Sequence, residues 1–186
     1  MKMEFDPVYT SFLKQQFQEG MALQARSDLL RLIPMPGPAS VPIHYRAEFR
    51  CTGLAQDPAG EVVEWSRWGV GIHFPPNYLR GPVHASQVLT FLGVGGRPDL
   101  EPMHPNIRPP FICLEITPGM RLTEILFALH DLLTWNLYQL RDEGLNHSAA
   151  QWARHQPADR FPIDARPLGR RSRTTARGEL EFEVIQ

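Results

Sequence analysis

The sequence predicts an α+β fold in which an N-terminal helix, an antiparallel β-meander, a functional loop and C-terminal helices follow one another along the chain. The middle of the chain alternates apolar and polar residues, as half-buried strands do, whereas both flanking regions repeat apolar residues at helical spacing. The length of 186 residues suits one domain of about 150 residues with short tails. An apolar content of 42% is enough to build a hydrophobic core.

The first predicted element is a helix from Phe12 to Leu32. Its aromatic, methionine and leucine residues fall roughly on one side of a helix. Gly20 lowers the intrinsic helix propensity of this segment. The run from Pro34 to Pro38 must end the helix, because a proline has no N–H to continue the hydrogen-bond ladder.

Three strands are predicted to form the meander. In the first, Ile43 to Leu54, every second residue is apolar as far as Cys51. A turn at Asp57 to Gly60 separates it from a second strand, Val62 to Phe74, and a third strand follows at Val83 to Leu92. Because Cys51 lies on the apolar face of this pattern, we expect it to be a buried core residue.

A loop and two helices are predicted to follow the strands. Residues Gly93 to Arg108 are rich in glycine and proline, and loops carried on a firm sheet are a common location for chemistry. Leucine and isoleucine then repeat every three or four residues from Leu122 to Trp135, the strongest helical pattern in the chain. A short last helix is predicted to end at Ala153 and to start at Asn146 or Ser148, and Asn146 is a suitable N-cap.

The chain divides into a main domain, residues 1–168, and a C-terminal tail, residues 169–186. Gly169 to Arg177 is rich in arginine and is predicted to be extended, solvated coil. From Glu179 to Ile185 glutamates alternate with apolar residues. That pattern can pair with an exposed sheet edge of the same chain or of a partner.

Composition argues against several classes of function. A net charge of −1 provides no broad positive field for nucleic acid. The chain has no long apolar run and no signal-peptide pattern, so we expect a cytoplasmic protein with no membrane partner. Two cysteines are too few for a disulfide framework or a cysteine-only zinc site, the histidines lack metal-binding spacing, and no phosphate-binding loop is present. We therefore expect no metal or other cofactor.

The strongest functional signal is His104-Pro105-Asn106, followed seven residues later by Cys113. A thiol can carry an acyl group as a thioester. An asparagine amide can donate a hydrogen bond to the oxyanion that forms when a nucleophile attacks, and Asn106 could also serve to order its own turn. His104 could act as a general base for the thiol or could hold the loop in place.

Two further segments flank this signal. Phe74-Pro75-Pro76-Asn77-Tyr78 lies upstream, and Leu145-Asn146-His147-Ser148-Ala149-Ala150 lies downstream. In this order, residues Val70 to Trp152 resemble the ubiquitin-conjugating enzyme (E2) family. In that family a Phe-Pro-x-x-Tyr-Pro segment precedes His-Pro-Asn, Ile-Cys-Leu and a Leu-Asn-x-x-Ala-Ala helix, and the fold is called UBC-like.

The resemblance implies a role for each candidate residue. Cys113 would accept the C-terminal carboxyl of a ubiquitin-like modifier protein from an E1-like activating enzyme, and would pass it to a target amine. Asn106 would support the oxyanion or order the loop, and His104 would be mainly structural. An incoming amine must lose a proton, and a carboxylate can assist this step. Asp142, with Glu143 beside it, occupies the stretch where the family commonly has such a group.

The chain also departs from common eukaryotic members. The spacer Ile107 to Phe111 is one residue shorter and lacks the usual Asn-Gly turn, and Ile116 to Met120 replaces a Trp-Ser-Pro segment. The chain looks more like the divergent bacterial branch encoded beside E1-like, ubiquitin-like and JAB-type isopeptidase genes. The resemblance to that branch implies a role in antiphage defence.

Three alternatives stay open at this point. The chain could be the E2-like partner of a nucleotidyltransferase in cyclic-oligonucleotide antiphage signalling, which would use the same thiol on a different carboxyl terminus. It could be a Cys/His thiol hydrolase that uses Cys113 and His104 and releases its product to water. It could also be a non-catalytic binding module with an E2-like shape.

Overall fold

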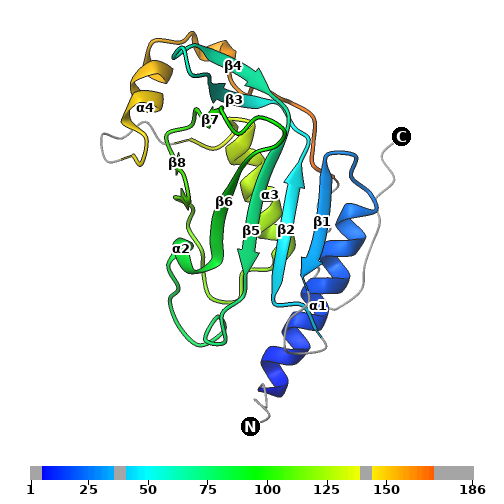
Figure 1. Ribbon diagram of the computed structural model, residues 1–186. Helices are drawn as coiled ribbons and strands as arrows, with labels where there is room; N and C mark the ends of the chain where they lie inside the picture. Colours follow the sequence, from blue (N-terminus) through cyan, green and yellow to red (C-terminus); the bar gives the residue numbers. More distant parts are fainter. Residues whose placement is uncertain (1–5, 36–40, 139–143, 170–186) are drawn as a thin grey trace.

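The computed structural model describes residues 6–35, 41–138 and 144–169 (Figure 1). The helices are α1 (Pro7–Gln24), α2 (Ala85–Val88), α3 (Leu122–Leu133) and α4 (His147–Arg154), with a 3-10 turn, η1 (Ala158–Arg160). The strands are β1 (Leu30–Met35), β2 (His44–Phe49), β3 (Gly53–Gln56), β4 (Val62–Trp65), β5 (Trp68–His73), β6 (Leu89–Val94), β7 (Glu101–Pro102), β8 (Ile107–Arg108) and β9 (Phe111–Ile112).

The centre of the fold is a four-stranded antiparallel sheet with the order β1-β2-β5-β6. Helices α1 and α3 lie behind this sheet in Figure 1. Strands β3, β4 and β7 form a smaller sheet with the order β4-β3-β7, and β8 and β9 form a two-stranded hairpin. The predicted α+β class, with an N-terminal helix, an antiparallel sheet and C-terminal helices, is confirmed.

The first helix differs from its prediction at both ends. It begins at Pro7, because the Asp6 side chain accepts the Val8 N–H at 2.9 Å and proline suits the first helical position. It ends at Gln24, and the leucines from Leu29 to Leu32 belong to the loop end and to β1. A short apolar run has no period of its own and fits a buried strand as well as a helix, so the prediction was wrong there.

Two of the predicted strands are each divided in two. The segment Ile43 to Leu54 forms β2 and the start of β3, and Val62 to Phe74 forms β4 and β5. The third predicted strand, Val83 to Leu92, contains the short helix α2 before it continues as β6. The divisions arise because β3 and β4 leave the main sheet to pair with each other, a tertiary effect that residue alternation does not report. The predicted inward face of the first segment is correct, and its apolar residues are buried as far as Cys51.

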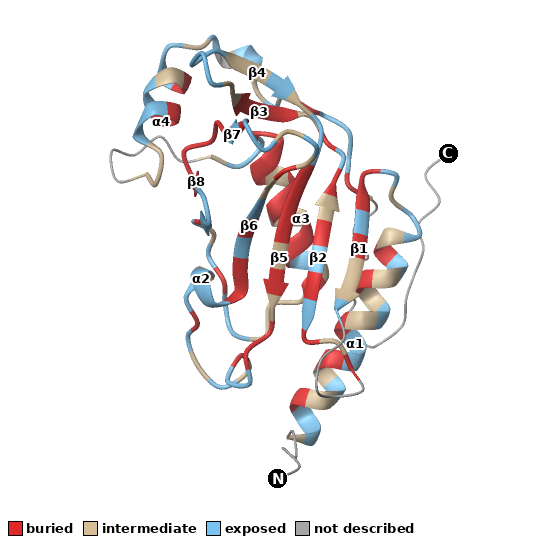
Figure 2. Cartoon of the chain, viewed as in Figure 1, coloured by how far each residue is buried: buried red, intermediate tan, exposed pale blue. Residues whose placement is uncertain are grey.

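The core lies between the main sheet and the two long helices (Figure 2). The leucine and isoleucine stripe of α3 is buried, as its spacing predicts. Each such side chain contributes about 1.5–3 kcal/mol when it is removed from water. The packing accounts for the glycine at position 20. A Cβ at this position would lie 2.8 Å from side-chain carbons of both Leu122 and Leu32, so glycine allows α1 to approach α3 and β1 closely.

No helix in the described part of the chain is both long enough and apolar enough to cross a membrane.

Candidate functional site

The β8–β9 hairpin brings Asn106 and Cys113 together. Ile107 pairs with Ile112 and Arg108 with Phe111, so Asn106 and Cys113 are the next residues along the two strands. The Cys113 N–H donates to the Asn106 carbonyl at 2.8 Å, which continues the ladder by one bond. The seven-residue spacing is therefore the length of a tight hairpin. The thiol of Cys113 is exposed at its end.

The side chain of Asn106 also holds Cys113. Its Nδ2 donates to the Cys113 carbonyl oxygen at 3.3 Å, whereas its own backbone carbonyl accepts the Cys113 N–H. The residue is 8% exposed, so its amide lies at the edge of the interior and close to the thiol-bearing backbone. The Asn106 side chain thus helps to fix the position of the residue that carries the thiol.

His104 lies beneath this loop. It is 2% exposed, its ring packs against Trp135 at a centroid distance of 4.7 Å, and its Nδ1 accepts the Asn106 N–H at 3.1 Å. Burial lowers the pKa of His104 to about 3, and the backbone of Leu137 offsets this only partly. Because Nδ1 accepts a hydrogen bond, the ring proton is assigned to Nε2 and the imidazole is neutral. These contacts fit a residue that holds the turn.

The downstream Leu-Asn motif fastens the same turn from the other side. The Asn146 N–H donates to the Pro105 carbonyl at 3.0 Å. The Asn146 side chain accepts the Ala149 N–H at 3.1 Å and so caps α4, which confirms the predicted N-cap. One asparagine therefore starts α4 and ties it to the His-Pro-Asn turn, although the two segments are far apart in the sequence.

The upstream aromatic segment supports the chain after Cys113. Phe74 and Tyr78 are fully buried and pack edge to face at a centroid distance of 4.9 Å. The Tyr78 hydroxyl donates to the Met120 carbonyl at 2.8 Å, just before α3 begins. The downstream segment therefore contacts the His-Pro-Asn turn directly, whereas the upstream segment contacts the chain at Met120, seven residues after Cys113.

Asp142 and Glu143, the candidates for assisting the attacking amine, lie outside the described residues. Residues 170–186 of the tail also lie outside them. Among the residues that the structure does describe, no group of three or more His, Cys, Asp or Glu side chains is placed to hold a metal ion.

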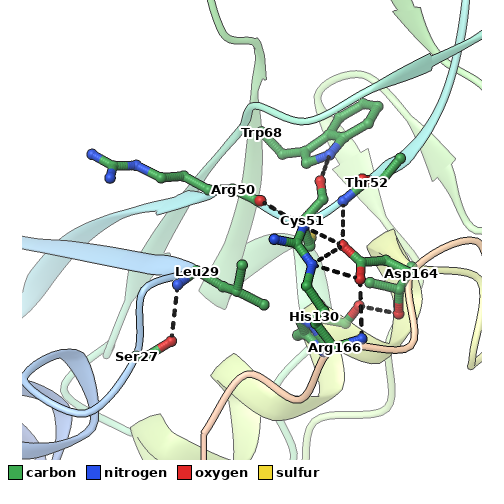
Figure 3. A network of polar contacts seen from close by, with 10 residues as sticks. Ser27, Leu29, Arg50, Cys51, Thr52, Trp68, His130, Asp164 and Arg166 are labelled. Atoms are coloured by element: carbon green, nitrogen blue, oxygen red, sulfur yellow. Dashed lines mark hydrogen bonds and ion pairs between the residues drawn. The ribbon is translucent and has the colours of Figure 1, made fainter.

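The second cysteine has a different environment (Figure 3). Cys51 is fully buried, as predicted, and burial raises the pKa of its thiol to about 12. Its carbonyl accepts the Trp68 indole N–H at 3.0 Å, and the adjacent Thr52 N–H donates to Asp164 at 2.7 Å. A thiol without solvent access that stays protonated at neutral pH is a poor nucleophile, so Cys51 is a core residue.

Sequence reasoning missed two residues that position this region. Trp135 lies at the end of the α3 pattern, stacks on Phe161 at 4.8 Å and covers His104. Asp164 accepts hydrogen bonds from Thr52 and from Arg166, which fastens the segment after α4 to the start of β3. An isolated tryptophan after a leucine-rich helix is a usable signal for a residue that anchors packing. The role of Asp164 could not be predicted in this way, because its partner Thr52 is 112 residues away in the sequence.

Comparison with known proteins adds no assignment. No protein-family model matches the chain. No curated protein sequence matches it either.

Proposed function

We propose that this chain is a UBC-like acyl carrier that holds the C-terminal carboxyl of a ubiquitin-like protein as a thioester on Cys113. The observation that carries the proposal is the paired contact between Asn106 and Cys113, which places an exposed thiol beside a buried amide donor. The β8–β9 hairpin, the capped helix α4 and the packing of His104 against Trp135 hold this pair. Such rigidity is what a thiol needs if its acyl group must meet two different partners in a fixed orientation.

The chemistry proceeds in two transfers. The Cys113 thiolate attacks the thioester carbonyl of a charged E1-like enzyme, a tetrahedral oxyanion forms, and the E1-like thiolate leaves. A target amine then attacks the new thioester, the Cys113 thiolate leaves, an amide bond forms, and the amine proton passes to solvent or to a nearby carboxylate. Each oxyanion needs a donor, and the Asn106 amide, which donates to the Cys113 carbonyl at rest, is placed in the same loop.

The setting that we propose follows from the resemblance. The chain would act in the bacterial cytoplasm within a ubiquitin-like conjugation system of the antiphage type. Its partners would be an E1-like activating enzyme, a modifier and a target amine, with a JAB-type isopeptidase encoded nearby. Residues Asp142 and Glu143 are retained as candidates for orienting the amine. The cyclic-oligonucleotide variant uses the same thiol and differs only in the carboxyl terminus that is loaded.

The geometry gives less support to a thiol hydrolase. A hydrolase of this kind needs a histidine that takes the thiol proton. His104 is buried, its Nδ1 already accepts the Asn106 N–H, and burial holds its pKa far below neutral pH. A non-catalytic binding module would not require the exposed thiol to be locked beside an amide donor.

The test is a charging assay. The chain is incubated with ATP and with the E1-like and ubiquitin-like proteins encoded beside its gene, and the products are separated without reductant. We expect one adduct that disappears on treatment with a thiol reductant and maps to Cys113 by mass spectrometry. A Cys113→Ala variant is the control and forms no adduct. If the E1-like enzyme is charged but this chain is not, the proposal is wrong. If free modifier is released with multiple turnover, the chain is a hydrolase.

A further inference from the structure

The outer face of the main sheet, opposite α1 and α3, carries a groove that the acyl-transfer proposal does not use. Its volume is about 1100 Å³. This face is turned toward the reader in Figure 1. Gly69, Gly93, Gly95 and Gly96 are among the residues that line it.

One side of this groove is basic. Arg31, Arg46 and Arg50 line it, from β1, β2 and the residue after β2. Arg67, between β4 and β5, lines the groove at the start of β5, where its carbonyl accepts the Gly95 N–H at 2.9 Å. We name the groove the arginine groove after these four residues. Arg31 and Arg46 share a single carboxylate, Glu48, at 3.4 and 3.1 Å. Neither Arg50 nor Arg67, both exposed, forms an ion pair with any described residue. The positive charge on this side therefore exceeds the negative charge that neutralises it.

The other side is mainly apolar and holds one carboxylate, Glu101. Pro98, Pro102 and Pro109 line it, and Leu92 of β6 is 51% exposed beside them. The sheet order β1-β2-β5-β6 separates the two sides, because the arginines of β1 and β2 lie on one flank of β5 whereas β6 and the segment after it lie on the other. An occupant that fits must be extended, with acidic groups along one side and apolar groups along the other.

Residues 179–185 of this chain have that pattern. Glu179, Glu181 and Glu183 alternate with Leu180, Phe182 and Val184. In an extended strand, successive side chains point to opposite sides, so a strand in the groove would direct its glutamates to the arginines and its apolar residues to the prolines.

The tail can reach the groove. Gly169, where the described chain ends, lies against Leu23 and the backbone of Arg26, close to the start of β1. The linker from Arg170 to Gly178 can extend to about 30 Å at roughly 3.3 Å per residue. Four strands spaced about 4.8 Å apart span roughly 15 Å, so the linker is long enough to pass the edge of β1 and cross the sheet.

The sheet edges are less suitable docking sites for the tail. On β1, Pro34 has no N–H, and the Leu32 N–H is already taken by the side chain of Gln24. On β6, the Phe91 N–H donates to the Pro110 carbonyl at 2.8 Å. Because both edges are partly closed, addition of a fifth strand is disfavoured and the open face is the better site.

We propose that residues 179–185 bind in the arginine groove of their own chain and cover this face of the sheet. This surface is separate from the Cys113 loop, and the inference stands whether or not the chain carries a thioester.

The test uses a fluorescent peptide with the sequence of residues 178–186 and the full-length chain. It compares wild type with a variant carrying Glu179→Lys, Glu181→Lys and Glu183→Lys, whose own tail is repelled by the arginines. A short tether gives an effective concentration of about 1 mM, so the wild-type tail competes strongly with added peptide. We expect the variant to bind the peptide about tenfold more tightly than wild type by fluorescence anisotropy, with the affinity falling as salt is raised.

Two additions to the triple variant locate the binding site. Arg50→Glu with Arg67→Glu should abolish peptide binding, whereas Arg154→Glu, exposed on α4 outside the groove, should leave it unchanged. Equal binding to wild type and the triple variant would show that the groove is open in the native protein, and no binding to either would show that it does not accept this sequence. Sedimentation as a dimer in wild type but not in the triple variant would assign the tail to a second copy. Each of these three results overturns the proposal.

Discussion

At the scale of single residues, the two cysteines differ in their reactivity because their environments differ. Cys113 stands exposed at the end of a hairpin, whereas Cys51 lies in the core and burial raises its thiol pKa to about 12. A nucleophile needs both solvent access and a thiolate fraction. These requirements leave Cys113 as the residue on which the proposed chemistry depends.

We expect Cys113→Ser to abolish transfer but to form a stable oxyester when it is charged, because an alkoxide is a much poorer leaving group than a thiolate. Cys51→Ala should keep charging and transfer intact and lower the free energy of unfolding by about 1–2 kcal/mol, because it leaves a small cavity. Gel assays and urea unfolding measure the two effects. Loss of charging in Cys51→Ala with normal thioester formation in Cys113→Ser would reverse the assignment.

Asn106 carries two roles that a single substitution can separate. Asn106→Ala removes the contact to the Cys113 carbonyl, so we expect a loss of about 0.5–1.5 kcal/mol in stability. If the amide also stabilises the oxyanion, single-turnover discharge to free lysine slows by about 10²–10³ while charging is less affected. Unchanged discharge would leave Asn106 with the loop-ordering role alone.

His104 gives the molecule a pH dependence that can be measured without any partner. Its pKa falls from 6.5 to about 3 on folding, so between these values the unfolded chain binds a proton that the folded protein does not. The free energy of unfolding therefore falls as the pH is lowered through this window. From pH 7 to pH 5 we expect wild type to lose about 2 kcal/mol more than His104→Gln in urea unfolding. His147→Gln, exposed at the start of α4, should behave as wild type does.

At the scale of elements, the segment after α4 depends on one carboxylate. Asp164 accepts hydrogen bonds from the Thr52 N–H at 2.7 Å and from the Arg166 guanidinium, which holds the pKa of this carboxyl well below its usual range. The Asp164 side chain is only 5% exposed, whereas that of Arg166 is 57% exposed. Most of the stabilisation therefore comes from satisfying the buried carboxylate, and the exposed charge pair contributes less.

We expect Asp164→Asn to lower the free energy of unfolding by about 2 kcal/mol at pH 7. Because folding depresses the pKa of Asp164, its contribution is present above the unfolded pKa and is lost as the pH falls toward the folded value, so wild type and variant should converge in acid. The matched control is Asp99→Asn, whose exposed pair with Arg97 at 2.6 Å should change stability by less than about 0.5 kcal/mol. Equal effects in both variants would contradict the anchoring role.

A comparison of the elements shows which structural features can be predicted from local sequence. Helix α3, the inward face of β2 and the Asn146 cap each follow from patterns within a few residues, and all three were predicted correctly. The leucines that enter β1 were assigned to a helix, because only pairing with β2 decides their structure. Strands β3 and β4 separate from the main sheet through pairing with each other and with the distant β7.

In the candidate site, too, some features follow from local sequence and others from contacts between distant segments. The motif singled out Asn106 and Cys113 as a functional pair, but the β8–β9 hairpin that brings them together was not predicted. The direction of the Asn106 amide and the support that Trp135 gives to His104 depend on contacts that no local pattern encodes.

At the scale of the whole molecule, the described segment from Phe161 to Leu168 packs against the rest of the fold. Leu168 is 1% exposed in the main core, and Phe161 stacks on Trp135. We expect a chain ending at Gly169 to melt within a few degrees of full length. A chain ending at Gln156 should lose at least about 4 kcal/mol, because it exposes the apolar surface that these residues cover. Differential scanning calorimetry measures both, and equal melting of the two truncated chains would show that this segment does not stabilise the core.

The contrast between the two cysteines has a practical consequence for the whole molecule. The chain has two cysteines, and the native fold presents one of them to solvent. A maleimide dye should therefore attach at one position without mutagenesis, and the second thiol should react only when the core opens. The slow rate of that second reaction would report global opening in native buffer. The natural sequence thus contains both a labelling site, Cys113, and a buried thiol, Cys51, whose labelling rate reports unfolding.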